Sequence, residues 1–143
     1  MKKSIQTSIH IQASTTQVWQ VLTDFENYPT WNPLLLSLNG NVAVGNTIAV
    51  DVQGMLFRPT VLTYIANENL TWLGKLWFRG LFDGEHQLRL VAQEDGSTIL
   101  HHTEQFSGLL VRLFSRQLDT KTKAGFEAMN LVVKNRAEGK TSK

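Results

Sequence analysis

The chain has 143 residues, of which 42% are hydrophobic and 18% are charged, and these values are typical of one globular domain with its own core. It contains no cysteine, which excludes disulfides, thiolate metal sites and cysteine nucleophiles. A net charge of +2 is too small to indicate nucleic-acid binding. No apolar stretch is long enough to cross a membrane, so stable membrane insertion is not expected. The first residues lack the apolar core of a signal peptide, and we expect a cytoplasmic location.

The first half of the chain predicts a strand, two short helices and then further strands. Residues 4–11 alternate and are rich in β-branched side chains, as in a strand. Ser14 is expected to cap a helix that runs to about Thr23, and a second short helix over 24–29 is expected to end at Pro29. Turn residues then separate a series of short strands, which we place at 34–38, 47–53, 56–65 and 70–76.

Two long antiparallel strands follow, over 85–91 and 98–108, joined by an acidic turn that contains Gly96. Strand side chains alternate between two faces, so one face of this pair collects a largely apolar set. Its members are His86, Leu88, Leu90, Leu100, His102, Glu104 and Phe106. Polar groups on an apolar face must be hydrogen-bonded, hydrated or functional, so the two imidazoles and the carboxyl predict a lined pocket.

From about Leu110 the apolar period changes to that of one long amphipathic helix, which we expect to continue to about Ala137. Gly125 within it predicts a bend or a close approach to the sheet. The order of elements predicts an α+β domain over 1–137, with one antiparallel sheet covered by helices on one side, and a disordered tail over 138–143. A curved sheet and a long helix can enclose a ligand between them.

The candidate chemistry centres on His86, His102 and Glu104. Three interpretations stay open: a hydrogen-bonded cluster that pins two strands, a contact with the polar end of a ligand, or an acid–base pair. No HExxH spacing and no fourth ligand accompany these residues, so we expect no metal and no cofactor. The expected ligand-binding residues are Trp72, His86, Leu88, Leu100, His102, Glu104, Phe106, Phe126 and Met129.

An ordered set of segments resembles the START/Bet v 1-like superfamily, also called SRPBCC, and in particular its polyketide cyclase/dehydrase and lipid-transport group. The segments are Ile9–Ser14, Val18-Trp19, Leu22–Phe25, Tyr28–Pro33, His86–Leu90 and Thr98–Gly108. The resemblance covers about Ile5 to Val133. It implies a helix-grip fold, in which a seven-stranded curved antiparallel sheet surrounds the long C-terminal helix and two short helices follow the first strand.

The resemblance also implies a cavity for apolar molecules such as lipids, sterols or polyketides. Members of the superfamily include carriers, receptors, cyclases and chaperone activators, so the fold alone does not decide the function. Our leading expectation is a protein, monomeric or homodimeric, that binds a small hydrophobic ligand and is not an enzyme. The alternatives are a polyketide cyclase or dehydratase with His102 and Glu104 as its acid–base pair, and a non-catalytic interaction module with a filled cavity.

Overall fold

The computed structural model describes residues 2–75 and 80–139, and in these ranges it contains eight strands and a long C-terminal helical segment. In chain order the elements are β1 (Lys2–Ile11), α1 (Thr15–Leu22), η1 (Phe25–Asn27), α2 (Tyr28–Trp31), β2 (Leu35–Asn39), β3 (Ala49–Val52), β4 (Met55–Phe57), β5 (Thr60–Ile65), β6 (Asn69–Lys75), β7 (Asp83–Ala92), β8 (Thr98–Ser107), α3 (Val111–Gln117), η2 (Leu118–Thr122) and α4 (Lys123–Ala137). The α+β helix-grip class is confirmed.

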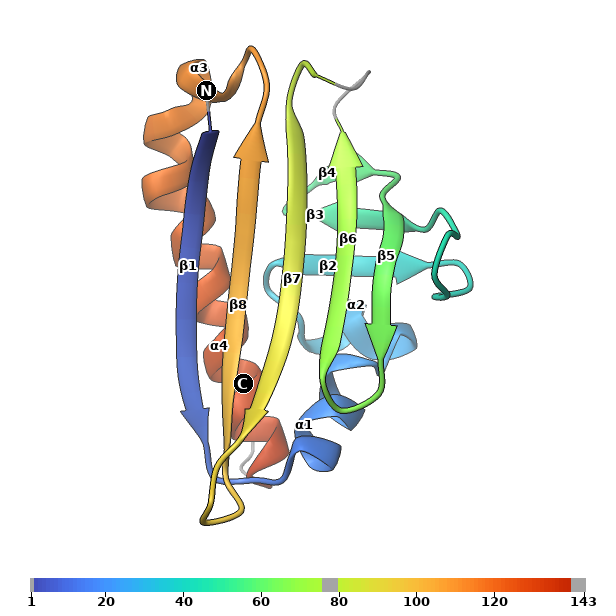
Figure 1. Cartoon of the computed structure of the whole chain (residues 1–143), viewed down its shortest axis with the longest axis vertical. Helices are drawn as coiled ribbons and strands as arrows, with labels where there is room; N and C mark the ends of the chain where they lie inside the picture. The colour runs from blue at the N-terminus through green and yellow to red at the C-terminus, as the bar shows by residue number, and fades with distance from the viewer. Residues whose placement is uncertain (1, 76–79, 140–143) are drawn as a thin grey trace.

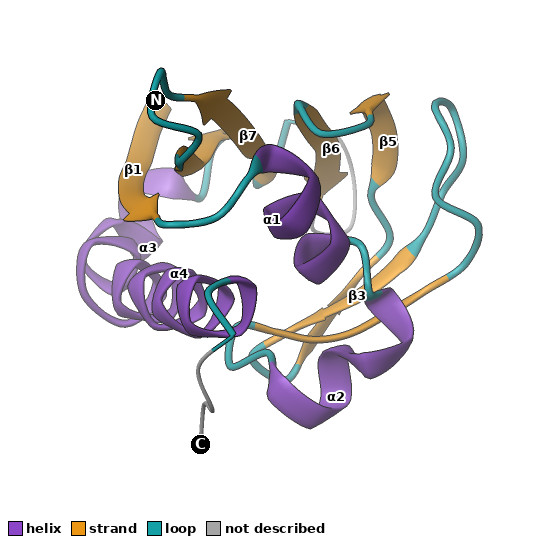
Figure 2. Ribbon diagram, turned by 90° about the horizontal axis from the view of Figure 1, so that it is seen from below, coloured by secondary structure: helices purple, strands orange, loops and turns teal. Residues whose placement is uncertain are grey.

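The strands form two sheets rather than the single seven-stranded sheet that was expected. One is a five-stranded antiparallel sheet in the order β1-β8-β7-β6-β5, and the other is a three-stranded sheet in the order β2-β3-β4. Figure 1 shows the second sheet crossing behind the first at a steep angle, and Figure 2 shows α4 and the second sheet facing different parts of the first. Three layers therefore surround the interior.

Pro59 explains the extra strand. The predicted strand over 56–65 is divided into β4 and β5 at Arg58-Pro59. Proline has no backbone N–H, and it restricts the residue before it, so it interrupts a ladder of hydrogen bonds. Where the two sheets meet, Thr47 and Thr60 form an isolated bridge, and the backbone N–H of Ile48 donates to the Pro59 carbonyl oxygen at 3.0 Å.

The N-terminal helices follow the predicted chemistry in one case and not in the other. Ser14 caps α1 in a capping box: its hydroxyl accepts from the Gln17 N–H, and the Gln17 side chain accepts from the Ser14 N–H. The prediction that Pro29 ends the second helix was wrong, because Pro29 lies in the first turn of α2. A proline is tolerated there, since the N–H that it lacks has no partner within the helix.

The C-terminal helix is continuous in direction but not uniform. Its middle segment, η2, is π-helical, so the predicted single regular helix from Leu110 is interrupted there. A Cβ atom on Gly125 would lie 2.5 Å from Nε2 of Gln53 and 3.0 Å from Cδ1 of Leu34, which confirms a close approach at this glycine. The contact brings the turn between β3 and β4 against the start of α4. No helix in the described ranges is long and apolar enough to span a membrane.

The predicted hairpin is confirmed, with β7 and β8 paired over ten residues each. Its inward face includes His86, Leu88, Leu100 and His102, all buried. At the start of the tail that was expected to be disordered, the Glu138 carboxylate accepts from the Gln12 N–H at 2.7 Å and from Lys134 at 2.6 Å. Residues 140–143 lie outside the described ranges.

Candidate functional site

A cavity of about 420 Å³ lies between the two sheets and the C-terminal helix. Each of the three layers contributes apolar side chains to its wall, among them Leu35, Val50 and Val52 from the small sheet, Trp72 and Phe106 from the large sheet, and Phe114, Leu118 and Phe126 from the helix. Few polar groups interrupt this wall. His86 and Glu104 come from the large sheet, Gln53 comes from the turn between β3 and β4, and Gln117, Lys121 and Thr122 come from the helix around η2. A mostly apolar wall with a few polar side chains is typical of a site for a small molecule.

The structure separates the nine expected ligand-binding residues into two groups. Five of them line the cavity: Trp72, His86, Glu104, Phe106 and Phe126. The other four are buried but are not part of the wall, and they are Leu88, Leu100, His102 and Met129. His102 therefore lies behind His86 when seen from the cavity.

A chain of hydrogen bonds runs from β1 through the helix to His86. Thr7 Oγ1 donates to the His102 carbonyl oxygen at 2.7 Å, and Nδ2 of Asn130 donates to Thr7 Oγ1 at 2.9 Å. The other end of the same amide, Oδ1 of Asn130, lies 2.8 Å from Nδ1 of His102. Nε2 of His102 in turn lies 2.7 Å from Nε2 of His86.

The directions of these bonds fix where the imidazole protons are. A carbonyl oxygen only accepts, so the one proton of the Thr7 hydroxyl is donated to the backbone carbonyl of His102. The hydroxyl oxygen must therefore accept from Asn130. Asn130 consequently presents its oxygen to His102, whose Nδ1 carries the proton. Neutral His102 then accepts at Nε2, and His86 donates from Nε2. Nδ1 of His86 is left as an acceptor, and it is buried without a hydrogen-bond partner in the described part of the chain.

Both imidazoles are neutral near pH 7. Burial, reinforced by the neighbouring His102, holds the pKa of His86 well below its ordinary value. Burial lowers the pKa of His102 to about 4, although the hydrogen bond to Asn130 acts in the opposite direction. The rings are also packed tightly. Trp72 stacks on His86 at a centroid distance of 4.5 Å, and Phe126 stacks on His102 at 4.2 Å.

Glu104 is the carboxyl group of the cavity wall. It lies directly opposite His86 in the β7–β8 pair, so both side chains leave the sheet on the same face. Part of its side chain remains exposed, yet burial raises the pKa of Glu104 to about 8. Its oxygens make no hydrogen bond or ion pair with any residue in the described ranges. A cavity with a neutral carboxylic acid beside a neutral imidazole can donate and accept protons.

Gly84 provides the room for this carboxyl. A Cβ atom on Gly84 would lie 2.2 Å from Oε2 of Glu104 and 3.5 Å from Cδ1 of Phe106. Gly84 pairs with Phe106 and precedes His86 by two residues on the same face of β7. The side chain of Glu104 thus lies over a position where the sheet has no side chain of its own.

Sequence reasoning missed Asn130 and Thr7, and it missed the wall formed by the small sheet. Asn130 could have been found, because it follows Phe126 by one helical turn and interrupts the apolar stripe of α4. Thr7 lies among inward-facing isoleucines of β1 and directly opposite His102. The small sheet gave no such signal, since its position against the helix depends on contacts distant in the sequence.

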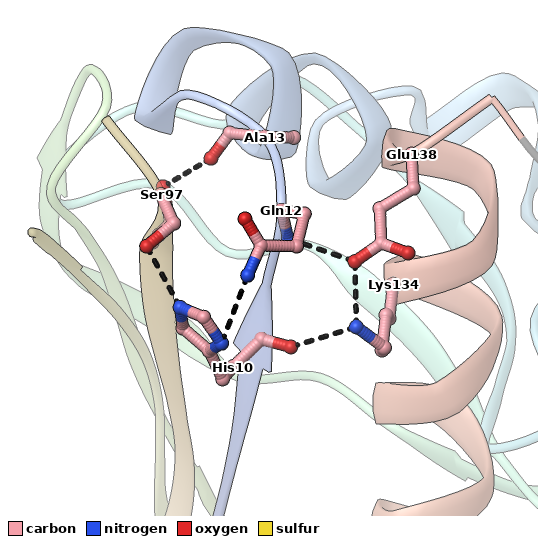
Figure 3. Close-up of polar contacts among 7 residues, drawn as sticks. His10, Gln12, Ala13, Ser97, Lys134 and Glu138 are labelled. Atoms are coloured by element: carbon pink, nitrogen blue, oxygen red, sulfur yellow. Dashed lines mark hydrogen bonds and ion pairs between the residues drawn. The ribbon is translucent and has the colours of Figure 1, made fainter. Parts of the chain in front are cut away.

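A second polar cluster lies at the other end of α4 (Figure 3). His10 Nε2 is 2.7 Å from the hydroxyl of Ser97, and that hydroxyl donates to Asp95 at 2.5 Å. Since a carboxylate only accepts, the Ser97 proton is committed to Asp95, and His10 must donate to Ser97. The histidine therefore cannot take a proton from this serine, and the cluster has no nucleophile.

The second cluster instead fastens the helix to the sheet. Lys134 donates to the His10 carbonyl oxygen at 3.0 Å, and Glu138 accepts from the backbone of Gln12 (Figure 3). These contacts tie the last turn of α4 to the end of β1. Within residues 2–75 and 80–139 there is also no group of three or more His, Asp or Glu side chains arranged to hold a metal ion.

Solved structures share the whole fold. A hypothetical protein from Helicobacter pylori, jhp0584, superposes with a TM-score of 0.80 at 12% identity, over 94% of this chain and 88% of its own. A START superfamily protein from Mycobacterium smegmatis gives 0.71 at 20% identity, over 95% and 97%. The di-domain ARO/CYC StfQ from the steffimycin biosynthetic pathway gives 0.77 at 11% identity, over 97% of this chain and 52% of its own. These identities are low, so the likeness shows the shared fold.

No curated protein matches the sequence. The family model described as polyketide cyclase/dehydrase and lipid transport, in contrast, matches residues 2–138, which is nearly the whole chain. The chain therefore belongs to the polyketide cyclase/dehydrase and lipid-transport family, within the START/Bet v 1-like superfamily that the sequence resembled.

Proposed function

We propose that this protein binds a small, mostly apolar molecule in the cavity between its two sheets and the C-terminal helix. The observation that supports this function best is the cavity of about 420 Å³ with its largely apolar wall. Removing ligand surface from water stabilises a complex by roughly 25 cal/mol per Å² of apolar area, before the costs of association. Membership of a family described as lipid transport and polyketide cyclase agrees with this class of ligand.

Native mass spectrometry of the protein, purified gently from its own host, tests the proposal. We expect a co-purifying small molecule that is lost on denaturation. A panel of fatty alcohols, sterols and aromatic polyketides added to stripped protein should include members that raise its melting temperature. A mass that always equals the bare chain, together with no thermal shift across the panel, would favour an interaction module without a ligand.

A matched pair of variants locates the binding site. Gly74 lies in the cavity wall, and its Cβ would meet only ordinary contacts, with Pro59 at 3.7 Å. We expect Gly74→Phe to fill the cavity and to lower affinity for any ligand by about tenfold or more. Leu73→Phe is the control, because Leu73 is the adjacent residue of β6 and points to the other face. Equal affinities of the two variants would place the ligand elsewhere.

A second candidate function is cyclase- or dehydratase-type catalysis, and the pairing of Glu104 with His86 favours it. In the dehydration of a β-hydroxy ketone, Nδ1 of His86 would take the α-proton while the C–H electron pair forms the new double bond. The hydroxyl would leave as water with the proton of Glu104, and proton return from His86 would restore both groups. In this arrangement His86, and not His102, is the residue of the cavity wall that acts as base.

Absorbance assays with a 4-aryl-4-hydroxybutan-2-one test this candidate, because the enone product absorbs at longer wavelength. An enzyme should lose turnover by about 10²-fold or more in Glu104→Gln. A protein that only binds should show no difference between the variant and the unmodified chain, both at the background rate.

A further inference from the structure

We propose that His86 and Glu104 together recognise one hydroxyl group of the ligand, which donates to Nδ1 of His86 and accepts from the carboxyl of Glu104. This inference rests on the proposed binding function and specifies the chemical class of the ligand as an apolar alcohol, phenol or enol. Neither the family nor the fold assigns this recognition. It follows from three features of the site: the fixed tautomer of His86, the position of Glu104, and the polar composition of the cavity wall.

The tautomer of His86 is set from outside the cavity. The bonds from Thr7 through Asn130 to His102 leave His102 as an acceptor, so His86 donates to it and keeps an unprotonated Nδ1. That nitrogen is buried, and it has no partner among the residues that the structure describes. A buried acceptor without a partner is unfavourable. The His86 ring belongs to the cavity wall, so a bound molecule can supply the missing donor.

Glu104 supplies the complementary group. It stands directly opposite His86 across β7 and β8, a separation at which one small group can contact both side chains. Its carboxyl makes no hydrogen bond within the described chain, and burial raises its pKa to about 8, so near neutral pH it carries a proton to donate. Nδ1 of His86 has almost no exposed surface, so a hydroxyl reaches it only when a neighbouring side chain moves. Glu104, without a hydrogen bond to hold it, can make that movement.

A hydroxyl is the simplest group that satisfies both residues, because it has one donor and two acceptor positions. An ether or ketone accepts from Glu104 but leaves His86 without a donor. A carboxylate also lacks a donor, and it would bring a negative charge to a part of the wall where the described residues include no cation. Among the described lining residues the one cationic side chain, Lys121, is exposed and therefore lies toward the opening. A carboxylate ligand would be drawn to that end instead.

Three probes with the same apolar body test the inference: 2-naphthol, 2-methoxynaphthalene and 2-naphthoate. Their affinities are measured by calorimetry, or by quenching of tryptophan fluorescence, near neutral pH. We expect 2-naphthol to bind about tenfold more tightly than 2-methoxynaphthalene, the effect of one well-formed hydrogen bond, with 2-naphthoate no tighter than the ether. If all three bind equally, the proposed binding function stands and the hydroxyl inference is overturned. If none binds, and a fluorescent apolar dye also fails to bind, the binding function itself is wrong.

A variant of Glu104 separates the roles of the two residues. Glu104→Leu should weaken the binding of 2-naphthol and of 2-methoxynaphthalene alike, because both accept from the carboxyl, and the preference for 2-naphthol, which arises at His86, should remain. Glu104→Gln should keep much of the affinity for both probes, since an amide also donates. Gln105→Leu is the control, because Gln105 is the exposed neighbour on the other face of β8. Affinities for both probes that stay unchanged in Glu104→Leu overturn the assignment of the carboxyl.

A direct measurement does not depend on any variant. The ¹⁵N chemical shifts of the imidazoles distinguish protonated from unprotonated nitrogens. We expect Nδ1 of His86 to be unprotonated in the free protein, and its resonance to shift upfield on addition of 2-naphthol but not of 2-methoxynaphthalene. A proton on that nitrogen in the free protein, or the same shift with both probes, overturns the inference.

Discussion

Asn130→Leu is the change that tests the polar chain behind the cavity. The Asn130 side chain is 2% exposed, and it makes two hydrogen bonds, one to His102 and one to Thr7. Leucine has the same branched shape and is larger, so the substitution removes the polar contacts without opening a cavity. It leaves Nδ1–H of His102 buried with no acceptor from the helix.

The expected cost follows from these contacts. Two hydrogen bonds contribute about 1 kcal/mol each, and an unsatisfied buried donor costs about 1–3 kcal/mol. The added apolar burial of leucine offsets about 1 kcal/mol of this. We therefore expect the free energy of unfolding to fall by about 2–4 kcal/mol. Urea titration followed by tryptophan fluorescence and by far-ultraviolet circular dichroism measures the change, with an unaltered urea dependence showing that the fold is retained.

Two further variants distinguish the loss of these hydrogen bonds from a general effect of placing leucine in the helix. Asn135→Leu lies on the same helix at a half-buried position without a side-chain hydrogen bond in the described ranges, so its effect should stay within about 0.5 kcal/mol. Thr7→Val removes the next partner along the chain, and the double variant with Asn130→Leu should cost about 1 kcal/mol less than the sum of the singles. A loss below about 1 kcal/mol for Asn130→Leu, equal to that of Asn135→Leu and additive with Thr7→Val, would refute the proton arrangement derived for both histidines.

Three other expectations concern single groups. Gly84→Ala should leave the fold intact but displace the carboxyl of Glu104, because the new Cβ would lie 2.2 Å from a flexible side-chain oxygen. Calorimetry should then show weaker binding of both 2-naphthol and 2-methoxynaphthalene, because both accept from that carboxyl, and unchanged affinities would contradict this contact. Tyr28→Phe should lower the free energy of unfolding by about 1–2 kcal/mol in urea titrations, because the buried Tyr28 hydroxyl donates to the carbonyl oxygen of Leu22; no change would show that this bond is unimportant. Burial raises the pKa of Glu104 from 4.5 to about 8, so the folded protein holds a proton that the unfolded chain loses above about pH 4.5. The free energy of unfolding, measured relative to that of Glu104→Gln, should be highest below that pH and should decline up to about pH 8. A difference that is flat or rises with pH would contradict a protonated Glu104.

Local rules predicted the elements wherever one stretch of sequence contains the whole cause. Ser14 and Gln17 form a capping box because both halves of the interaction lie within four residues. The alternation in the β7–β8 hairpin placed His86, His102 and Glu104 on the inward face before any tertiary contact was known. Pro29 was misplaced because proline is common in the first turn of a helix as well as just after its end, and only the tertiary fold decides which applies.

The depth of each site residue could not be predicted from alternation. His86 and His102 share a face and are both buried, yet only His86 lines the cavity. The difference arises because α4 passes close to β1 and covers His102 with Phe126 and Asn130. That crossing depends on packing between segments more than a hundred residues apart, about which the local pattern contains no information.

The arrangement of polar groups explains how a small domain keeps ionisable residues next to an apolar cavity. A line of hydrogen bonds satisfies His102 completely and fixes its proton, so its polarity is confined to the layer between sheet and helix. On the cavity side, β7 and β8 present Nδ1 of His86 and the carboxyl of Glu104, and neither has a hydrogen-bond partner among the described residues, which is unfavourable while no ligand contacts them. A ligand that offers both roles removes this cost on binding, whereas a purely apolar one does not. Under the proposed function, selectivity therefore depends on the buried line of hydrogen bonds, and affinity depends on the apolar wall.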